Sequence, residues 1–347
     1  MALTNEQKEK ISIEVIKTLV ARFESFPKDA SNNRNAPFHE AFLKAFADEL
    51  EGSVSNVPFF ISLSSWLHGL NTTLGQVFFE KVAHILCNGE KREYTSKKLK
   101  NLFITQKQQN IITRIMTDLS NSSAKPNLKE ENSRILINDN SSKIKSPDFS
   151  ADVFFEDENV ITAIELKSVK PNSGEMRGEK QKILAGKAAL FHLFPNKKIN
   201  FFFGFPFDPT VDPQTEIVTS FNKERFFASV INMEKFCDKK EVLIADELWD
   251  FLSGKSNTMK AILEIINTIA TPSFLDKFQL LTDNSKRNTV EYSNQLKEWC
   301  LFSELKLVNN DGAIRENLNP RTMRTYNKTS FDGDGKYNWD RYNALKE

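Results

Sequence analysis

The chain has 347 residues, of which 39% are hydrophobic and 27% are charged, and its formal net charge at pH 7 is +1. This length accommodates one large domain or two modest ones. The balanced charge excludes the global basic field of a histone-like protein, so a DNA-binding surface would have to gather its positive charge on one face. No apolar run approaches the roughly 18 residues of a membrane span, and the polar start does not resemble a signal peptide, which predicts a cytoplasmic protein.

The elements expected first along the chain are helices. Apolar residues recur at helical spacing in an N-terminal region covering residues 1–60, and again within residues 62–86. A short strand is expected at residues 134–137, between two polar loops. A hairpin follows, with β-branched and aromatic strands at residues 151–156 and 160–169.

Helices and strands are expected beyond the hairpin as well. The pattern predicts a helix over residues 175–193, strands at 199–207 and 241–245, and helices near 247–252, 259–269 and 273–281. The order helix, strand, strand, strand, helix, strand predicts a mixed α/β fold, with a mixed sheet flanked by helices and further helical parts at both ends. We expect this core to cover residues 61–282. The polar, aromatic and basic region 283–347 is expected to be a DNA-contacting or dimer arm.

The second hairpin strand carries an acid and a base on one face, Glu165 and Lys167, because side chains alternate along a strand. If the hairpin closes symmetrically, Asp152 lies opposite Glu165 with Cβ atoms about 4.5–5.5 Å apart. Two carboxylates this close repel each other unless a cation lies between them. Such an oxygen-only pair suits Mg²⁺, with Mn²⁺ as a substitute. With Lys167 placed to orient or deprotonate a water, the pattern predicts phosphodiester hydrolysis.

The Glu-x-Lys spacing alone is a weak signal, because it occurs three times in this charged chain. One copy lies in the polar N-terminal helix. A second, Glu304 and Lys306, lies in a strand-like context but has no acid-bearing partner strand. Only Glu165 and Lys167 follow such a strand across a tight turn. The alternative interpretation is a solvated hairpin edge with a surface ion pair.

The segment SPDFSADVFFEDENVITAIELKSVKPN resembles the PD-(D/E)xK nuclease motif, and the element order resembles the αβββαβ core of that superfamily. Together with the upstream LNTTLGQVFFEKVAHIL, roughly residues 60–280 are similar to type II restriction endonucleases of the TdeIII kind. The resemblance implies a homodimeric prokaryotic enzyme that cuts double-stranded DNA at a short palindromic site, GGNCC for this kind. It also implies a cognate DNA methyltransferase as a genetic partner rather than a bound subunit.

The resemblance assigns roles to particular residues. Glu165 matches the metal-binding acid and Lys167 the catalytic lysine. Two residues are candidates for the first aspartate of the motif. Hairpin pairing favours Asp152 for catalysis and metal binding. Asp148, which follows Pro147 as in the motif, is the second choice, because four residues of extended strand would place it about 13 Å from Asp152. Glu80 matches an auxiliary acid, with an exposed surface glutamate as the alternative.

Basic side chains outside the motif are candidates for DNA contact, since phosphates supply affinity without sequence choice. The alternative for any charged run is a solvated face. The candidates are Lys170, Arg177, Lys180, Arg321 and Arg324. Two other functions remain open from the sequence: a repair or junction-resolving nuclease on the same core, and a non-catalytic DNA-binding module.

Overall fold

The computed structural model describes residues 3–27, 57–167 and 173–343, together with four isolated positions between 41 and 50. The chain forms two compact units. The first unit comprises Met1–Leu3 and Phe79–Leu263, and the second comprises Thr4–Phe78 and Glu264–Glu347. The N-terminal helix and the C-terminal helices thus belong to one unit, which differs from the three ranges expected from the sequence.

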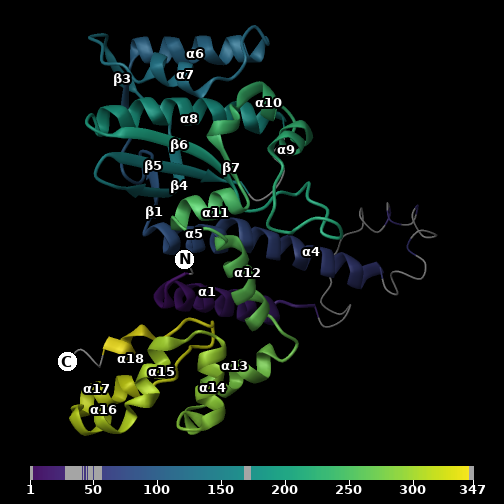
Figure 1. Cartoon of the computed structure of the whole chain (residues 1–347), viewed down its shortest axis with the longest axis vertical. Helices are drawn as coiled ribbons and strands as arrows, with labels where there is room; N and C mark the ends of the chain where they lie inside the picture. The colour runs from purple at the N-terminus through teal and green to yellow at the C-terminus, as the bar shows by residue number, and fades with distance from the viewer. Residues whose placement is uncertain are drawn as a thin grey trace. The chain divides into compact units, whose positions relative to one another are not determined.

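A mixed five-stranded sheet forms the centre of the first unit (Figure 1). The first three neighbours in it run antiparallel and the last three run parallel. In spatial order the strands are β1 (Glu90–Tyr94), β4 (Phe149–Glu156), β5 (Val160–Leu166), β6 (Lys198–Phe205) and β7 (Val242–Ile244). A separate two-stranded sheet joins β2 (Phe103–Thr105) to β3 (Lys143–Lys145).

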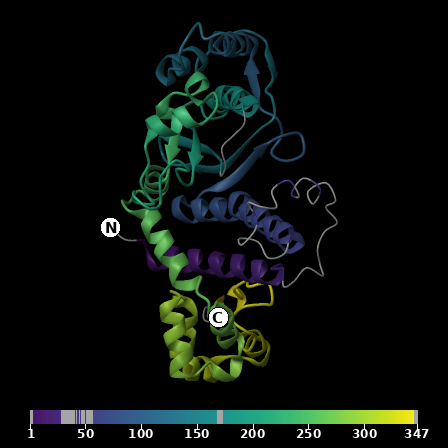
Figure 2. The ribbon, with the colours of Figure 1, turned by 90° about the vertical axis from the view of Figure 1, so that its right-hand side faces the viewer.

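Helices cover both faces of the large sheet, as Figures 1 and 2 show. On one face α8 packs against β4 and β6, with α6 packed on α8; on the other, α5 contacts β4 and α11 contacts β7. Gly186 lets α8 approach closely, because a Cβ there would lie 2.8 Å from the ring of Phe201. The helices of this unit are α5 (Phe79–Cys87), α6 (Gln106–Ser120), α7 (Leu128–Ile135), α8 (Ser173–Leu193), α9 (Lys223–Ser229), α10 (Met233–Phe236), the 3₁₀ turn η4 (Lys239–Glu241) and α11 (Asp246–Ser253).

The mixed α/β fold predicted from the sequence is confirmed. The order α5–β1–β4–β5–α8–β6 is the expected αβββαβ pattern, with β2, α6, α7 and β3 lying between β1 and β4 in the chain. The predicted strand at residues 134–137 is wrong. Those residues end α7, a helix that begins where the Asn127 side chain accepts the N–H of Glu130. The first strand of the core is instead β1, a polar segment.

Four buried charged side chains fix α8 to its neighbours. The Lys180 amine lies 2.6 Å from Glu131 of α7 and also contacts Glu241 of η4, and Lys187 lies 2.9 Å from Glu241. Two ammonium groups thus balance two carboxylates, which is how charge is tolerated away from water. Burial alone would lower the pKa of Lys180, but the two carboxylates outweigh it and the pKa is raised.

The second unit is helical. Its elements are α1 (Asn5–Glu24), α4 (Val57–Thr73), the π-helical turn η3 (Leu74–Phe78), α13 (Phe274–Thr282), the 3₁₀ turn η5 (Asn284–Lys286), α14 (Val290–Glu298), α15 (Phe302–Asn309), α16 (Asp311–Asn317), α17 (Pro320–Tyr326) and α18 (Trp339–Asn343). Helix α12 (Thr258–Ile269) leads from the first unit into this one.

The C-terminal region contributes to the core of the second unit, through a buried ion pair. Arg341 donates to both carboxylate oxygens of Glu304, at 2.7 and 2.9 Å, and Tyr337 donates to the same group at 3.1 Å. All three side chains are buried. The strand-like reading of the Glu304 segment is therefore wrong: α15 is a helix, and its acid is neutralised inside the unit.

Candidate active site

The β4–β5 hairpin brings the two predicted acids together. Its cross-strand pairs, from Glu156↔Ile161 to Val153↔Ile164, follow one constant register. Continued by one residue, that register sets Asp152 opposite Glu165. Asp152 Oδ2 accepts the backbone N–H of Leu166 at 2.9 Å, which fixes the carboxylate at the end of β5. The hairpin geometry is the predicted one, while the catalytic roles of these residues stay predictions.

Lys167 lies between two carboxylates. Its Nζ is 3.2 Å from Glu165 Oε1 and 3.4 Å from Glu179 Oε1, and Glu179 also pairs with Lys182 at 2.8 Å. Glu179 comes from α8, so the lysine joins the end of β5 to the helix that covers the sheet. The side chains of Glu165 and Lys167 are only 13% and 16% exposed, which means that both are held in place rather than solvated.

A second lysine, Lys91 of β1, lies on the other side of Asp152. Its Nζ is 3.0 Å from Asp152 Oδ1 and 2.9 Å from Glu80 Oε1. Glu80 therefore reaches the site through an ion pair. One turn along the same helix, His84 Nε2 donates to the backbone carbonyl of Asp152 at 2.7 Å. Helix α5 thus contacts Asp152 at two points.

The acids of this site are electrostatically strained. Burial, and then the charge of Asp152, raises the pKa of Glu165 to about 7, although Lys167 acts in the opposite direction. Burial also raises the pKa of Glu80. For Lys91, burial alone would lower the pKa, but hydrogen bonds to Glu80 and Asp152 outweigh it, so the amine stays charged. Burial lowers the pKa of His84, which favours a neutral ring that donates one N–H.

The donor atoms fit a hard divalent cation. Among the described residues, no group of three or more His, Cys, Asp or Glu side chains is placed to enclose a metal ion. The site offers a pair of carboxylates instead, Asp152 and Glu165. A zinc site needs more protein ligands, whereas Mg²⁺ keeps several waters and takes one or two carboxylates. The raised pKa of Glu165 also supports a cation site, because a cation between the two acids would offset the repulsion from Asp152 that helps to raise it.

Asp148, the second choice for the first acid, lies elsewhere. It precedes β4, is exposed, and accepts a hydrogen bond from the Asn101 side chain. Because β4 continues extended from Phe149, Asp148 is about 13 Å along the strand from Asp152. The structure therefore does not bring Asp148 to the pair that Asp152 forms with Glu165.

The predicted DNA-contacting residues have different outcomes. Lys180 is completely buried in its ion-pair network and cannot meet a phosphate, so this prediction is wrong. Arg177, Arg321 and Arg324 are exposed, and their contact with DNA stays a prediction. Lys170 lies outside the described residues.

Two residues of the site were not assigned to it from the sequence. These residues are Lys91 of β1 and Glu179 of α8. A signal for Lys91 was present, since Gly89 ends α5 and the alternating EKREY segment fits an edge strand. No spacing in the sequence points from Glu179 to Lys167, because that contact depends on how α8 packs.

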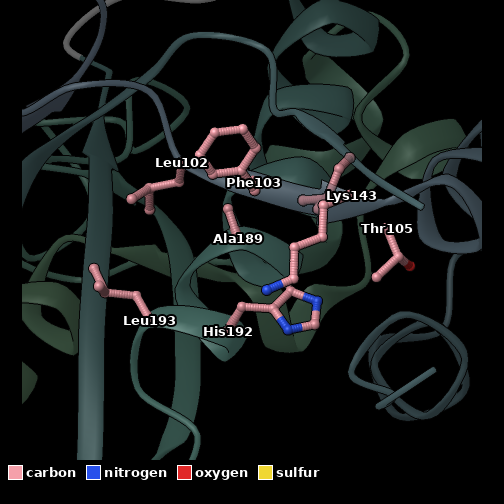
Figure 3. A pocket seen from close by; sticks show the side chains of 8 residues that line it. Leu102, Phe103, Thr105, Lys143, Ala189, His192 and Leu193 are labelled. Carbon is pink, nitrogen blue, oxygen red and sulfur yellow. The ribbon is translucent and has the colours of Figure 1, made fainter. Parts of the chain in front are cut away.

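A pocket of about 200 Å³ lies elsewhere in the first unit (Figure 3). It is mostly apolar; Lys143 reaches toward the ring of His192, whose Nε2 lies 2.9 Å from Gln108 Oε1. The lining consists of Leu102, Phe103, Ile104, Thr105, Lys143, Ala189, His192 and Leu193. None of the acids of the hairpin lines it, so the pocket is separate from the candidate chemistry. No helix in the described part of the chain combines the length and the hydrophobicity needed to cross a membrane.

Comparison with known proteins gives two matches. The model of a family described as type II restriction endonuclease, HinfI, matches residues 3–270. A curated relative, the type II restriction enzyme MjaII of Methanocaldococcus jannaschii, is 42% identical over 372 aligned positions, covering 100% of this chain and 98% of the relative. No solved structure matches the chain. The narrower likeness to the TdeIII kind is tested by neither match. Both matches include α5, the hairpin and α8, and so all the residues of the site.

Proposed function

This chain belongs to the HinfI family of type II restriction endonucleases, and we propose that it hydrolyses phosphodiester bonds of double-stranded DNA with Mg²⁺ held by Asp152 and Glu165. The chain is a site-specific endonuclease. The observation that supports this assignment best is the lysine beside a carboxylate pair: Lys167 Nζ lies 3.2 Å from Glu165, and Asp152 is the cross-strand neighbour of Glu165. Neither a solvated hairpin edge nor a non-catalytic module would need to bury these groups.

Each residue would have a distinct task. Asp152 and Glu165 would hold the divalent ion, which would supply Lewis-acid chemistry to the scissile phosphate and to the attacking water. Lys167 orients that water and offsets negative charge that develops on the phosphate oxygens. Glu179 holds the Lys167 amine from the α8 side, so that the ammonium does not swing into solvent. Glu80 acts on the site through Lys91, as an auxiliary acid.

The resemblance found in the sequence extends the proposal. We propose GGNCC as the recognition sequence and Mn²⁺ as a metal ion that can replace Mg²⁺. A palindromic recognition sequence is two-fold symmetric and suits a homodimer, in which the active site of each subunit cuts one DNA strand. The cognate DNA methyltransferase would be a genetic partner in the cytoplasm of a prokaryotic cell. Arg177, Arg321 and Arg324 remain the proposed phosphate contacts.

A plasmid digest tests the proposal. Plasmid of known sequence is incubated with the protein and Mg²⁺, and the cut ends are mapped. We expect discrete fragments with ends in GGNCC. A repair or junction-resolving nuclease acts on damaged or structured DNA, and would therefore leave a relaxed, undamaged plasmid largely intact. Fragments that end in another fixed sequence would show that GGNCC is wrong, but would still support a type II restriction endonuclease.

Point variants test the residues. Glu165→Gln and Lys167→Met should each abolish cleavage while DNA binding stays within about twofold. Matched controls are Glu158→Gln in the exposed hairpin turn and Lys198→Met at the exposed start of β6, both of which should cut normally. Unchanged cleavage by either active-site variant would reject the assignment of this site.

A further inference from the structure

The ammonium group of Lys91 lies where two carboxylates converge. Its Nζ is 2.9 Å from Glu80 Oε1 and 3.0 Å from Asp152 Oδ1. The side chains of these two acids are only 14% and 13% exposed, whereas that of Lys91 is 38% exposed. The lysine thus closes the side of Asp152 that faces α5. Asp152 Oδ2 is already engaged by the N–H of Leu166.

Three local features fix this arrangement. First, the chain leaves α5 through Asn88, whose φ of 52° is left-handed, and through Gly89, where a Cβ would lie 2.9 Å from the carbonyl oxygen of Phe154. This tight turn starts β1 directly against β4. Second, β4 has one extra residue between its pairs with Glu90 and Arg92, so that Asp152 and Val153 both oppose Lys91. Such a bulge redirects a side chain, here the carboxylate of Asp152.

The third feature is the hydrogen bond from His84 to the carbonyl of Asp152. His84 lies four residues after Glu80, so both side chains are on the same face of α5. The histidine holds the bulged backbone while Glu80 holds the lysine. The position of the Lys91 amine is therefore determined by α5, β1 and β4 together, which a lone surface ion pair would not require.

We propose that Lys91 is a built-in cation that takes the place of a second metal ion, so that the site binds a single divalent ion between Asp152 and Glu165. The inference rests on the proposed function, because that function supplies the first ion. A second ion bridging Glu80 and Asp152 would have to occupy the place of the ammonium group. Two cations at one position repel each other too strongly to coexist.

The charge of the site agrees with one ion. When all groups are ionised, four carboxylates and three ammonium groups give −4 + 3 = −1, so one divalent ion brings the site to +1. A second ion would leave a site of charge +3. The groups counted are Glu80, Asp152, Glu165, Glu179, Lys91, Lys167 and Lys182. Lys91 is thus a positioning residue that sets how many metal ions the acids accept.

Counting bound Mn²⁺ tests this inference without DNA and without cleavage. Free Mn²⁺ is followed by electron paramagnetic resonance during a titration of the full chain. We expect the wild type to bind one ion per chain, and Glu165→Gln to bind none. Lys91→Met should bind two ions about 3.5–4 Å apart, with a spin-coupled signal. Lys91→Met combined with Glu80→Gln should return the count to one.

Controls separate the charge of Lys91 from its bulk. Lys91→Arg keeps the charge and should bind one ion, and Lys97→Met, at an exposed lysine beyond β1, should also bind one. A Lys91→Met protein that still binds a single ion would overturn the inference. If that variant does not fold, the wild type suffices: two bound ions, of which Glu80→Gln removes one, would overturn it equally. If the wild type and Glu165→Gln bind the same number of ions, Glu165 does not hold a metal ion, and the proposed function is contradicted instead.

Discussion

The apparent affinity of the site for Mg²⁺ should depend steeply on pH, because one of its two carboxylates is half protonated near neutrality. Burial and the charge of Asp152 raise the pKa of Glu165 from 4.5 to about 7. Only the ionised carboxylate binds a cation, so a proton competes with the metal. The affinity should fall as the pH drops through this pKa, and level off above it.

The size of the effect follows from the ionised fraction. With a pKa near 7, about nine-tenths of Glu165 is ionised at pH 8, and about one-tenth at pH 6. The apparent dissociation constant for Mg²⁺ should therefore rise about tenfold from pH 8 to pH 6, and about tenfold again by pH 5. An ordinary glutamate with a pKa of 4.5 would leave the value almost unchanged between pH 8 and pH 6.

Isothermal titration calorimetry of the DNA-free chain at pH 5, 6, 7 and 8 measures this dependence. Lys167→Met removes the positive charge that lowers the pKa of Glu165, so its midpoint should move to higher pH. Lys198→Met, at an exposed lysine outside the site, should keep the wild-type midpoint. A dissociation constant that changes less than twofold between pH 8 and pH 6 would refute the reasoning.

Three further predictions concern stability and DNA contact. Without metal, the raised pKa of Glu165 makes the folded chain bind more protons than the unfolded chain between pH 4.5 and about 7, so stability falls as the pH rises through this window. Glu165→Gln should therefore stabilise the metal-free protein at pH 8, by up to about 3 kcal/mol in urea unfolding; a lower midpoint would contradict this. Arg341→Met leaves the buried Glu304 without its bidentate partner and should cost about 3–5 kcal/mol in the same assay, and a loss below about 1 kcal/mol would show that the pair is dispensable. Replacing Arg321 and Arg324 together by Ala should lower the slope of log K against log salt by about 2 in filter binding, with the cut sequence unchanged. An unchanged slope would remove both from the interface.

The part of the site that could be predicted from the sequence is the part built by local chain geometry. The β4–β5 hairpin depends on alternation in two adjacent strands and on a turn whose Asp157 side chain accepts the N–H groups of Asn159 and Val160, at 2.8 and 2.7 Å. Once the turn is placed, the register pairs Asp152 with Glu165 without any distant information. The fold class follows from the same local signals, since most helices and strands of the core show the spacing of apolar residues that is typical of their type.

The parts that were missed depend on contacts between distant segments. Strand β1 contains almost no apolar residue, because it is an edge strand whose outer side faces solvent, so its sequence pattern does not predict a strand. The segment at 134–137 looked like a strand, yet its apolar residues pack as the end of a helix. In the C-terminal region, Arg341 and Glu304 become core residues only because each neutralises the other across 37 positions of sequence.

The two groups of charges in the first unit explain why chemistry is expected in one place and not in the other. Lys180, Lys187, Glu131 and Glu241 form a balanced set, two positive and two negative, that is closed to water and needs nothing from outside. Glu179, the residue before Lys180, is not part of this set; its carboxylate lies instead in the acid-rich group around Lys167. Balanced charge fixes α8, and the fixed helix presents one more carboxylate to a site that already has an excess of them. A protein tolerates such an unbalanced, half-buried group of acids where a bound cation offsets their charge.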